Sequence, residues 1–220
     1  MRVLIGCERS GIVRDAFRKL GHDAWSCDVL DAETPSPFHI KDDVLNHLND
    51  GWDLAGFHPN CQNLCVSGAR YFKDKKDVQE RDLLFVKTLL DADIPRIYLE
   101  NPVGVISTRI RKPDQIVQPW MFGHEESKAT CLWLKNLPKL VPTQIMEIRN
   151  KNLTPSGQNK LGPSADRAYL RARTYPGIAW AMSIQWSAWT GNLPSKKQTE
   201  CQNNEKLLGN ELLVDTREVG

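Results

Sequence analysis

The sequence predicts an α/β fold with a doubly wound, mostly parallel sheet. Along its first half, short apolar runs typical of buried strands alternate with segments whose apolar residues recur at helical spacing. Polar loops follow the expected strands, and 40% apolar and 25% charged residues in a chain of 220 are typical of a globular domain. Ligands of such sheets bind outside the carboxyl ends of the strands, so the residues that follow each strand are the first candidates for a site.

Strands and helices alternate in the first half in the order that builds a parallel sheet. The run RVLI is expected to be a buried strand, and residues 12–20 a helix that Gly21 ends. Asp42 and Asp43 are expected to open a short helix after a loop rich in Pro and Thr. Further strands are expected over residues 23–27, 53–57 and 96–100, and a covering helix over 77–90.

The second half is less regular. Residues 130–137 predict a strand, and the apolar residues of 177–189 predict a helix with one apolar face. Residues 150–167 are expected to form a polar loop of the kind that often lies over a site. Residues 1–190 are therefore expected to fold as one α/β domain, with residues 191–220 as a flexible tail.

Composition narrows the class of protein. The six cysteines are scattered and no secretion signal is evident, so free thiols and a cytoplasmic protein are expected. No apolar stretch is long enough for a membrane span, and the cysteines lack the spacing of a metal site. The net charge of +2 is small, but basic residues gather at 70–76, 109–112 and 167–173, where they would suit phosphates or form solvated surface.

The first strand-to-helix turn, GCERSG, predicts a cofactor site. Gly6, Cys7 and Gly11 stand in this turn, but the third glycine of the dinucleotide fingerprint is missing. Asp28 closes the next strand, where a carboxylate can hold the ribose hydroxyls of an adenosine, and Asp43 follows the third segment, where it can contact the adenine edge. Because a pyrophosphate is disfavoured without the fingerprint, S-adenosylmethionine fits these residues best.

The loop HPNCQNLC after the strand at 53–57 predicts a nucleophile. Cys61 stands on a loop that Pro59 stiffens, at the edge of the sheet where ligands bind. A free thiol has a pKa near 8.5, yet it is nucleophilic enough to add to an electron-poor ring. Cys65 lies four residues further on and is expected to be a small buried residue that supports the loop.

Glu100 and Asn101 end the next expected strand, and in a parallel sheet they would lie beside the Cys61 loop. A carboxyl group there can share a proton with a ring nitrogen of a pyrimidine and draw electrons from the carbon that the thiolate attacks. An isolated Glu-Asn pair would more often cap a turn, but the placement at adjacent strand ends favours chemistry. Asn101 is expected to help fix the loop.

These residues occur in the order of the cytosine-5 DNA methyltransferase motifs. The blocks VSGAR, ENPVGVISTRIRKPDQI, ESKATCLWLK and RTYPGIAWAM resemble those of short phage and prophage DNA cytosine methyltransferases, over about residues 1–190. The resemblance implies a Rossmann-like class I methyltransferase fold. It further implies that Cys61 adds to carbon 6 of cytosine, that Glu100 supports ring nitrogen 3, and that carbon 5 takes a methyl group from S-adenosylmethionine.

The chain departs from this family in its loop and in its substrate contacts. Asn60 replaces the proline that usually precedes the nucleophile, and Lys128 stands nearest to the arginines that hold substrate in the family. The large target-recognition domain of the family has no counterpart, so readout of a target sequence would be reduced, absent, or supplied by a partner or a homo-oligomer. Arg70, Arg109 and His124 are the further candidates for substrate contacts.

Three functions remain open on this basis. The first is methyl transfer to cytosine in DNA, whether single-stranded, distorted or duplex, since an enzyme acting on duplex DNA must flip its base out. The second is a non-catalytic module with a methyltransferase-like fold that binds nucleic acid or protein, with an anti-restriction or regulatory role. The third is a pyrimidine-modifying enzyme that acts on cytosine nucleotides.

Overall fold

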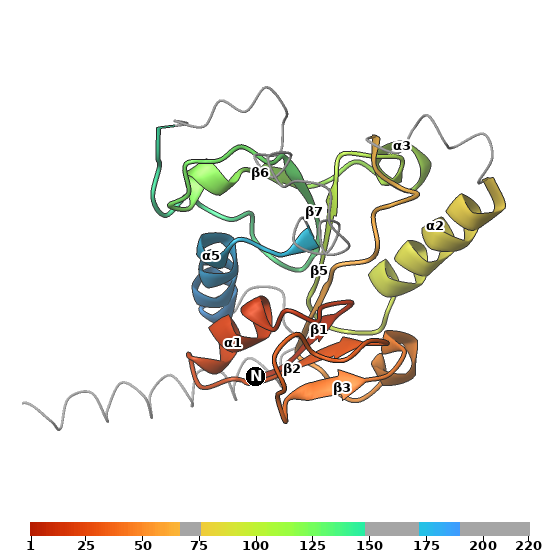
Figure 1. Cartoon of the computed structure of the whole chain (residues 1–220), viewed down its shortest axis with the longest axis horizontal. Coiled ribbons are helices and arrows are strands. Elements are labelled where there is room, and N and C mark those ends of the chain that lie inside the picture. Colours follow the sequence, from red (N-terminus) through yellow and green to blue (C-terminus); the bar gives the residue numbers. More distant parts are fainter. Residues whose placement is uncertain (67–75, 148–171, 190–220) are drawn as a thin grey trace, which may run out of the picture.

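The computed structural model describes residues 1–66, 76–147 and 172–189, which are built around a twisted sheet (Figure 1). In these residues the sheet has seven strands in the order β3-β2-β1-β4-β5-β7-β6. The strands are β1 (Arg2–Gly6), β2 (Asp23–Asp28), β3 (His39–Lys41), β4 (Leu54–Phe57), β5 (Ile97–Pro102), β6 (Gln115–Val117) and β7 (Thr130–Lys135).

The strand directions confirm the predicted doubly wound, mostly parallel α/β fold. Strands β1 to β5 are all parallel to one another, while β7 runs antiparallel to both β5 and β6. This order, with one reversed strand between the fifth and sixth, is the arrangement of the Rossmann-like class I methyltransferase fold. The chain therefore has the fold class that its pattern of strands and helices predicts.

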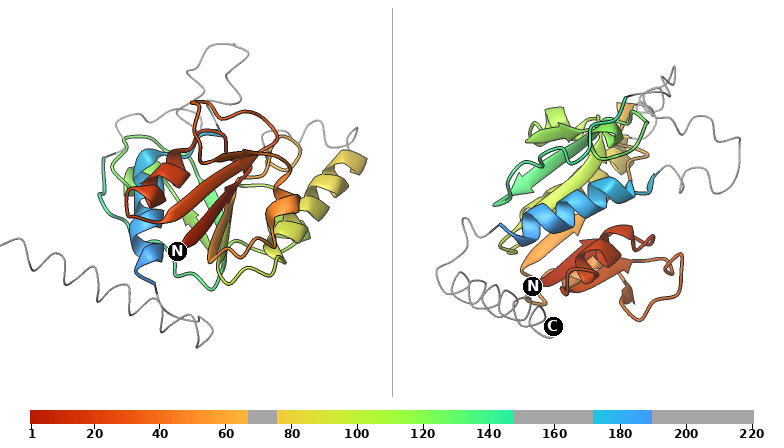
Figure 2. Two further views of the ribbon diagram at one scale, coloured as in Figure 1. Left: turned by 90° about the horizontal axis from the view of Figure 1, so that it is seen from below. Right: turned by 90° about the vertical axis from the view of Figure 1, so that its left-hand side faces the viewer.

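Helices cover both faces of the sheet. On one face α1 (Ile12–Arg18) and α5 (Pro176–Ser187) lie side by side (Figure 2), and a buried core forms around Phe17 and Trp186. On the other face α2 (Lys76–Leu90) packs through Leu83, Val86 and Leu89. The shorter helices are η1 (Val44–His47), α3 (Ile106–Arg109) and η3 (Pro119–Met121).

The register of the central strands sets the position of the expected site. Gly6 pairs with both Cys27 and Phe57, so the residues after β1, β2 and β4 emerge at one edge of the sheet. Phe57 pairs in turn with Leu99, which places Glu100 next to the loop that follows β4. The predicted convergence of these strand ends is thus a feature of the fold.

Several elements differ from the sequence prediction. The helix expected over 12–20 ends at Arg18, and Gly21 follows with a φ of 78°. Strands β3 and β6, three residues each, were not predicted, because so short a run carries no period that can be recognised. The polar loop at 150–167 and the tail at 191–220 lie outside the described residues. Among the described helices, none is both long and apolar enough to cross a membrane.

Candidate active site at the carboxyl ends of the strands

The loop after β4 holds Cys61 in a tight series of turns. The side-chain oxygen of Asn60 accepts a hydrogen bond of 2.9 Å from the N–H of Gln62, which closes an Asx turn around Cys61. The carbonyl of Cys61 then accepts from the N–H groups of Leu64 at 3.0 Å and Cys65 at 2.9 Å. Asn60, the residue that departs from the family pattern, therefore orders this loop through its side chain.

The segment after β5 packs directly onto this loop at Gly104. A Cβ atom at Gly104 would lie 2.0 Å from the carbonyl oxygen of Leu64, a distance that no real contact allows. The same carbonyl accepts a hydrogen bond of 2.8 Å from the N–H of Val105, and the N–H of Val66 donates to Val103 at 3.1 Å. The two loops are thus joined backbone to backbone.

Asn101 ties the loop to the end of β5. Its side-chain N–H donates to the carbonyl of Pro59 over 2.9 Å, and the residue is 1% exposed. Its Oδ1 atom is buried and has no hydrogen-bond partner among the described residues. The expected contact between Asn101 and the Cys61 loop is therefore present, and one acceptor of Asn101 remains available to a ligand or water.

Glu100 lies beside the loop with a carboxyl of raised pKa. Its side chain is 13% exposed. Burial raises the pKa of Glu100 because the carboxylate loses hydration, while the positive charge of Lys128 opposes this rise. The rise is toward the protonated form, in which a carboxyl group can donate to a ring nitrogen.

The Cys61 thiol is protonated in the structure as it stands. Its side-chain hydrogen bond with Cys65 raises the pKa of Cys61, and burial and the charge of Glu100 raise it further. Lys128 is the group that lowers it. Cys65 therefore contacts the thiol as well as packing below the loop, and the thiolate has to form when a substrate arrives.

Lys128 is the basic residue that the fold brings to this pair. It precedes β7, and its Nζ lies 5.8 Å from the centre of the Tyr175 ring. Its backbone N–H donates to Gln118 at 2.8 Å, which fixes this segment. Its charge acts on Cys61 and on Glu100, so the predicted proximity of Lys128 to the site is present in the fold.

The expected cofactor residues gather around the first turn. Burial raises the pKa of the Cys7 thiol, and the charges of Asp28 and Asp43 raise it further, which places both carboxylates near that thiol. Cys7 has a φ of 59° and Gly11 a φ of 74°, so the turn uses two residues in the left-handed region. Gly6 serves packing, because a Cβ there would lie 2.5 Å from the Val44 side chain.

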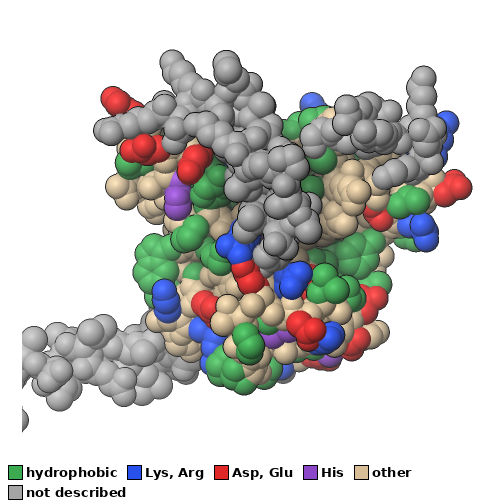
Figure 3. Space-filling view, viewed as in Figure 1, with side chains coloured by type: hydrophobic (Ala, Val, Ile, Leu, Met, Phe, Trp, Pro, Cys, Tyr) green, Lys and Arg blue, Asp and Glu red, His purple; other side chains and the backbone are tan. Residues whose placement is uncertain are grey.

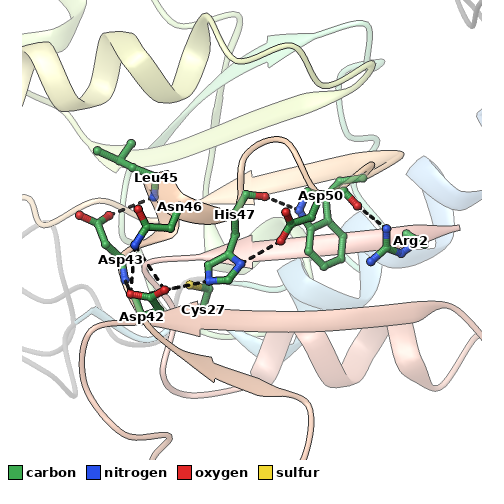
Figure 4. A network of polar contacts seen from close by, with 9 residues as sticks. Arg2, Cys27, Asp42, Asp43, Leu45, Asn46, His47 and Asp50 are labelled. Carbon is green, nitrogen blue, oxygen red and sulfur yellow. Dashed lines mark hydrogen bonds and ion pairs between the residues drawn. The ribbon is translucent and has the colours of Figure 1, made fainter.

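Asp28 and Asp43 are both anchored by local hydrogen bonds. Asp28 accepts from the N–H of Leu30 at 2.9 Å, and Asp43 caps η1 by accepting from the N–H of Leu45 at 3.0 Å. Figure 4 shows Asp43 in a wider polar network in which His47 bridges Asp42 and Asp50. The position of Asp43 therefore depends on this network as well as on its own cap.

Glu8 is a buried residue of the first turn that was not among the predicted site residues. One carboxyl oxygen, Oε1, accepts from the hydroxyl of Ser10 at 2.7 Å and from the N–H of Val13 at 3.1 Å, while Oε2 has no partner among the described residues. Burial raises the pKa of Glu8. A charged residue within a polar loop gives no sequence signal of burial, so only the fold reveals it.

Of the other predicted substrate residues, His124 packs its ring on Tyr175, with ring centres 5.0 Å apart, beside the ring that Lys128 faces. His124 accepts a hydrogen bond of 3.0 Å at Nε2 from the N–H of Gly177, so it holds the start of α5. Arg109 pairs on the surface with both carboxyl oxygens of Glu80, at 2.8 and 3.0 Å. Arg70 lies outside the described residues.

Charged side chains of both signs lie on the surface of the described residues. Figure 3 shows basic and acidic side chains interspersed on the face that it draws. Within residues 1–66, 76–147 and 172–189, no group of three or more His, Cys, Asp or Glu side chains is arranged to hold a metal ion. A groove of about 410 Å³ lies between η1 and α2, and none of the predicted site residues lines it.

Comparisons with known proteins add little to this geometry. No protein-family profile and no curated protein matches the chain. A solved structure from E. coli, described as a candidate DNA modification methyltransferase encoded within a prophage, matches with a TM-score of 0.44 and 14% sequence identity. The match covers 67% of this chain and about half, 52%, of that one. So distant a likeness carries no argument about activity, which has to come from the site.

Proposed function

We propose that this protein is an S-adenosylmethionine-dependent methyltransferase that acts on carbon 5 of cytosine in DNA. The observation that supports this most is the placement of Cys61 and Glu100 at the ends of neighbouring strands, on a loop that Asn101 fixes through Pro59. A thiol and a carboxyl group at the ends of neighbouring strands can act on two positions of the same pyrimidine ring, as addition to that ring requires. The fold class is in keeping with the proposal.

In the proposed reaction Cys61 and Glu100 act on opposite ends of one conjugated system. The Cys61 thiol first loses its proton to water. Its sulfur then forms a bond to carbon 6 of cytosine while the carboxyl proton of Glu100 passes to ring nitrogen 3, so that carbon 5 becomes nucleophilic. Carbon 5 then takes the methyl group and loses its own proton to a base. Elimination breaks the bond between sulfur and carbon 6, and the proton on nitrogen 3 returns to Glu100.

The proposed cofactor residues would hold an adenosine. Asp28 at the end of β2 would hold the ribose hydroxyls, and Asp43 would face the adenine edge. Gly6, Cys7 and Gly11 belong to the first turn, and Pro59 follows β4, the strand that pairs with β1. When bound, S-adenosylmethionine supplies the methyl group from its sulfonium. The unpartnered Oε2 of Glu8 is a further polar atom of this turn that a bound ligand can satisfy.

Because the pKa of the Cys61 thiol is raised, we expect this thiol to be unreactive until substrate binds. Without substrate the Cys65 hydrogen bond and burial hold the proton on sulfur, so the free protein should react slowly with thiol reagents. The positive charge of Lys128 opposes this and favours the thiolate.

A mechanism-based trap tests the proposal. An oligonucleotide with 5-fluorocytosine should form a stable covalent complex with the protein in the presence of S-adenosylmethionine, because fluorine blocks removal of the group on carbon 5. Peptide mapping should find the adduct on Cys61. Cys61→Ser should abolish the complex, whereas Cys65→Ser should retain it, because a hydroxyl can keep the hydrogen bond to the Cys61 thiol.

The trap also separates the proposal from its rivals. Equal loss of the complex in the folded Cys61 and Cys65 variants would contradict the assignment of the nucleophile. A complex with 5-fluoro-deoxycytidine monophosphate and none with single-stranded or duplex DNA would indicate an enzyme of nucleotide metabolism. Absence of any complex, together with no binding of S-adenosylmethionine by calorimetry, would indicate a non-catalytic module.

A further inference from the structure

His58 stands between the two halves of the site, and the proposed reaction leaves it without a role. Its backbone N–H donates to the carbonyl of Gly6 over 3.0 Å. Its ring nitrogen Nε2 lies 3.0 Å from the hydroxyl of Tyr98, and Nδ1 lies 3.8 Å from Oε2 of Glu100. The side chain is 8% exposed. One buried imidazole therefore connects the first turn, a buried phenol and the proposed catalytic carboxyl.

The three side chains meet because of their positions on neighbouring strands. Tyr98 and Glu100 are two residues apart on β5, so their side chains leave the same face of the sheet. His58 follows β4, the strand paired with β5, and its ring meets the Tyr98 ring edge to face at 5.5 Å. Gly56 leaves room for this arrangement, because a Cβ there would lie 2.1 Å from the Tyr98 ring.

The contact with Tyr98 determines which ring nitrogen of His58 carries the proton. Tyr98 is fully buried, and burial raises its pKa well above 10.0, so the phenol keeps its proton. Among the described residues, the His58 ring is the hydrogen-bond partner of the Tyr98 hydroxyl. The hydroxyl therefore donates to Nε2, and a neutral imidazole that accepts at Nε2 has its proton on Nδ1.

The imidazole is neutral, so its contact with Glu100 is not an ion pair. Burial lowers the pKa of His58 to about 3, and the charge of Lys128 lowers it further. Tyr98 and Glu100 face the ring from β5, and Lys128 acts on it from the segment before β7. With the proton on Nδ1, the ring presents a single neutral N–H to the carboxyl of Glu100.

We propose that His58 is a positioning residue for Glu100, a role that rests on the proposed function. Its Nδ1–H donates to Oε2 of Glu100 and leaves Oε1 to carry the carboxyl proton toward ring nitrogen 3 of cytosine. The present separation of 3.8 Å is longer than a hydrogen bond, so the contact has to shorten by about 0.8 Å when substrate binds. Catalytic contacts of unliganded enzymes commonly tighten in this way.

The tautomer of His58 gives a test that does not depend on activity. In protein labelled with ¹⁵N-histidine, long-range ¹H–¹⁵N spectra should show the His58 proton on Nδ1. Tyr98→Phe removes the donor to Nε2 and keeps the ring that packs on Trp186 at 4.8 Å, so it should yield a mixture of tautomers. A wild-type ring with its proton on Nε2 would overturn the proposal.

Two isosteric variants test the positioning itself. Asn at position 58 keeps an N–H near the place of Nδ1, and Gln keeps a polar group near the place of Nε2. If His58 positions Glu100, His58→Asn should retain more methylation than His58→Gln, by about tenfold or more in kcat, with little difference in KM. Equal kcat in the two variants at equal thermal stability would reduce His58 to a packing residue and refute the role.

A carboxyl titration separates failure of this inference from failure of the proposed function. The positive end of the Nδ1–H dipole, whose nitrogen lies 3.8 Å from Oε2 before any substrate binds, favours the charged carboxylate and lowers its pKa. His58→Gln should therefore raise the pKa of Glu100 relative to His58→Asn, as followed by ¹³C-labelled glutamate in the unliganded protein. If the wild-type protein methylates no substrate but this shift is present, the proposed function fails and the contact stands. If methylation is present and the shift is absent, the role of His58 fails alone.

Discussion

At the scale of single residues, Gly104 is the position that most tightly constrains the proposed site. Gly104→Ala would force the backbone of Leu64 away, because its Cβ would lie 2.0 Å from the Leu64 carbonyl oxygen. We expect a loss of about 1–3 kcal/mol in the free energy of unfolding, as for other overpacked sites, measured by urea denaturation. We also expect the 5-fluorocytosine adduct to form far more slowly, because the Cys61 loop moves.

Gly21 provides the matched control for this change. Gly21 has a φ of 78° and nothing within 4 Å of an added Cβ, so Gly21→Ala tests backbone strain without a clash. It should cost about 1–2 kcal/mol of stability and leave the rate of adduct formation unchanged. Similar adduct rates in the two variants would show that the contact at Gly104 does not govern the loop.

Individual residues of the site differed in how far the sequence could reveal them. The pairing of Cys61 with Glu100 was predictable, because both directly follow apolar runs that read as strands. The Asx turn of Asn60 and the burial of Glu8 were not, because both depend on backbone conformations that no short pattern specifies. His58 carried a signal in its place next to Pro59, but its partners Tyr98 and Glu100 lie about 40 residues away in sequence.

At the scale of elements, the network around η1 should make part of the stability depend on pH. Hydrogen bonds with Asp50 and Asp42 raise the pKa of His47 above 6.5. The protonated ring therefore stabilises the folded state fully below pH 6.5, and this contribution is lost as the pH rises through the folded pKa. Hydrogen bonds lower the pKa of Asp42, so its contribution is lost at the acid end.

His47→Gln isolates this effect from the other histidines. Burial lowers the pKa of His22 to about 4 and that of His58 to about 3, so both destabilise the fold when the pH falls below about 6.5. The difference in Tm between wild type and His47→Gln should therefore be followed at each pH. It should be largest below pH 6.5 and should shrink as the pH rises through the raised pKa of His47. A difference that is constant across this range would contradict the assignment.

At the scale of the whole molecule, the first half of the fold was more predictable from the sequence than the second half. Alternating apolar runs and helical periods specify β1, β2, β4, β5 and the helices that cover them, because each is long enough to show a period. The reversal of β7 was not predictable, since its apolar run reads the same in either direction.

The described core also predicts where the folding unit ends. Its buried apolar residues extend from Val3 to Trp186, and Arg96 donates to the carbonyl of Trp189 over 3.2 Å, close to the last described residue. A chain that ends at Thr190 should therefore keep its free energy of unfolding within about 0.5 kcal/mol of the full chain, as changes outside a core usually do. The measurement is urea denaturation of both proteins.

Trp186→Ala gives the contrasting change inside the unit. Trp186 is fully buried, packs on Tyr98 with ring centres 4.8 Å apart, and donates to the carbonyl of Pro138 over 3.0 Å. Its removal should cost about 3–5 kcal/mol, since a large cavity and an unpaired carbonyl remain. If the truncated chain loses stability on this scale, residues 191–220 belong to the folding unit. The truncation leaves every residue of α5 in place, so a loss that large would have to come from contacts that residues 191–220 make.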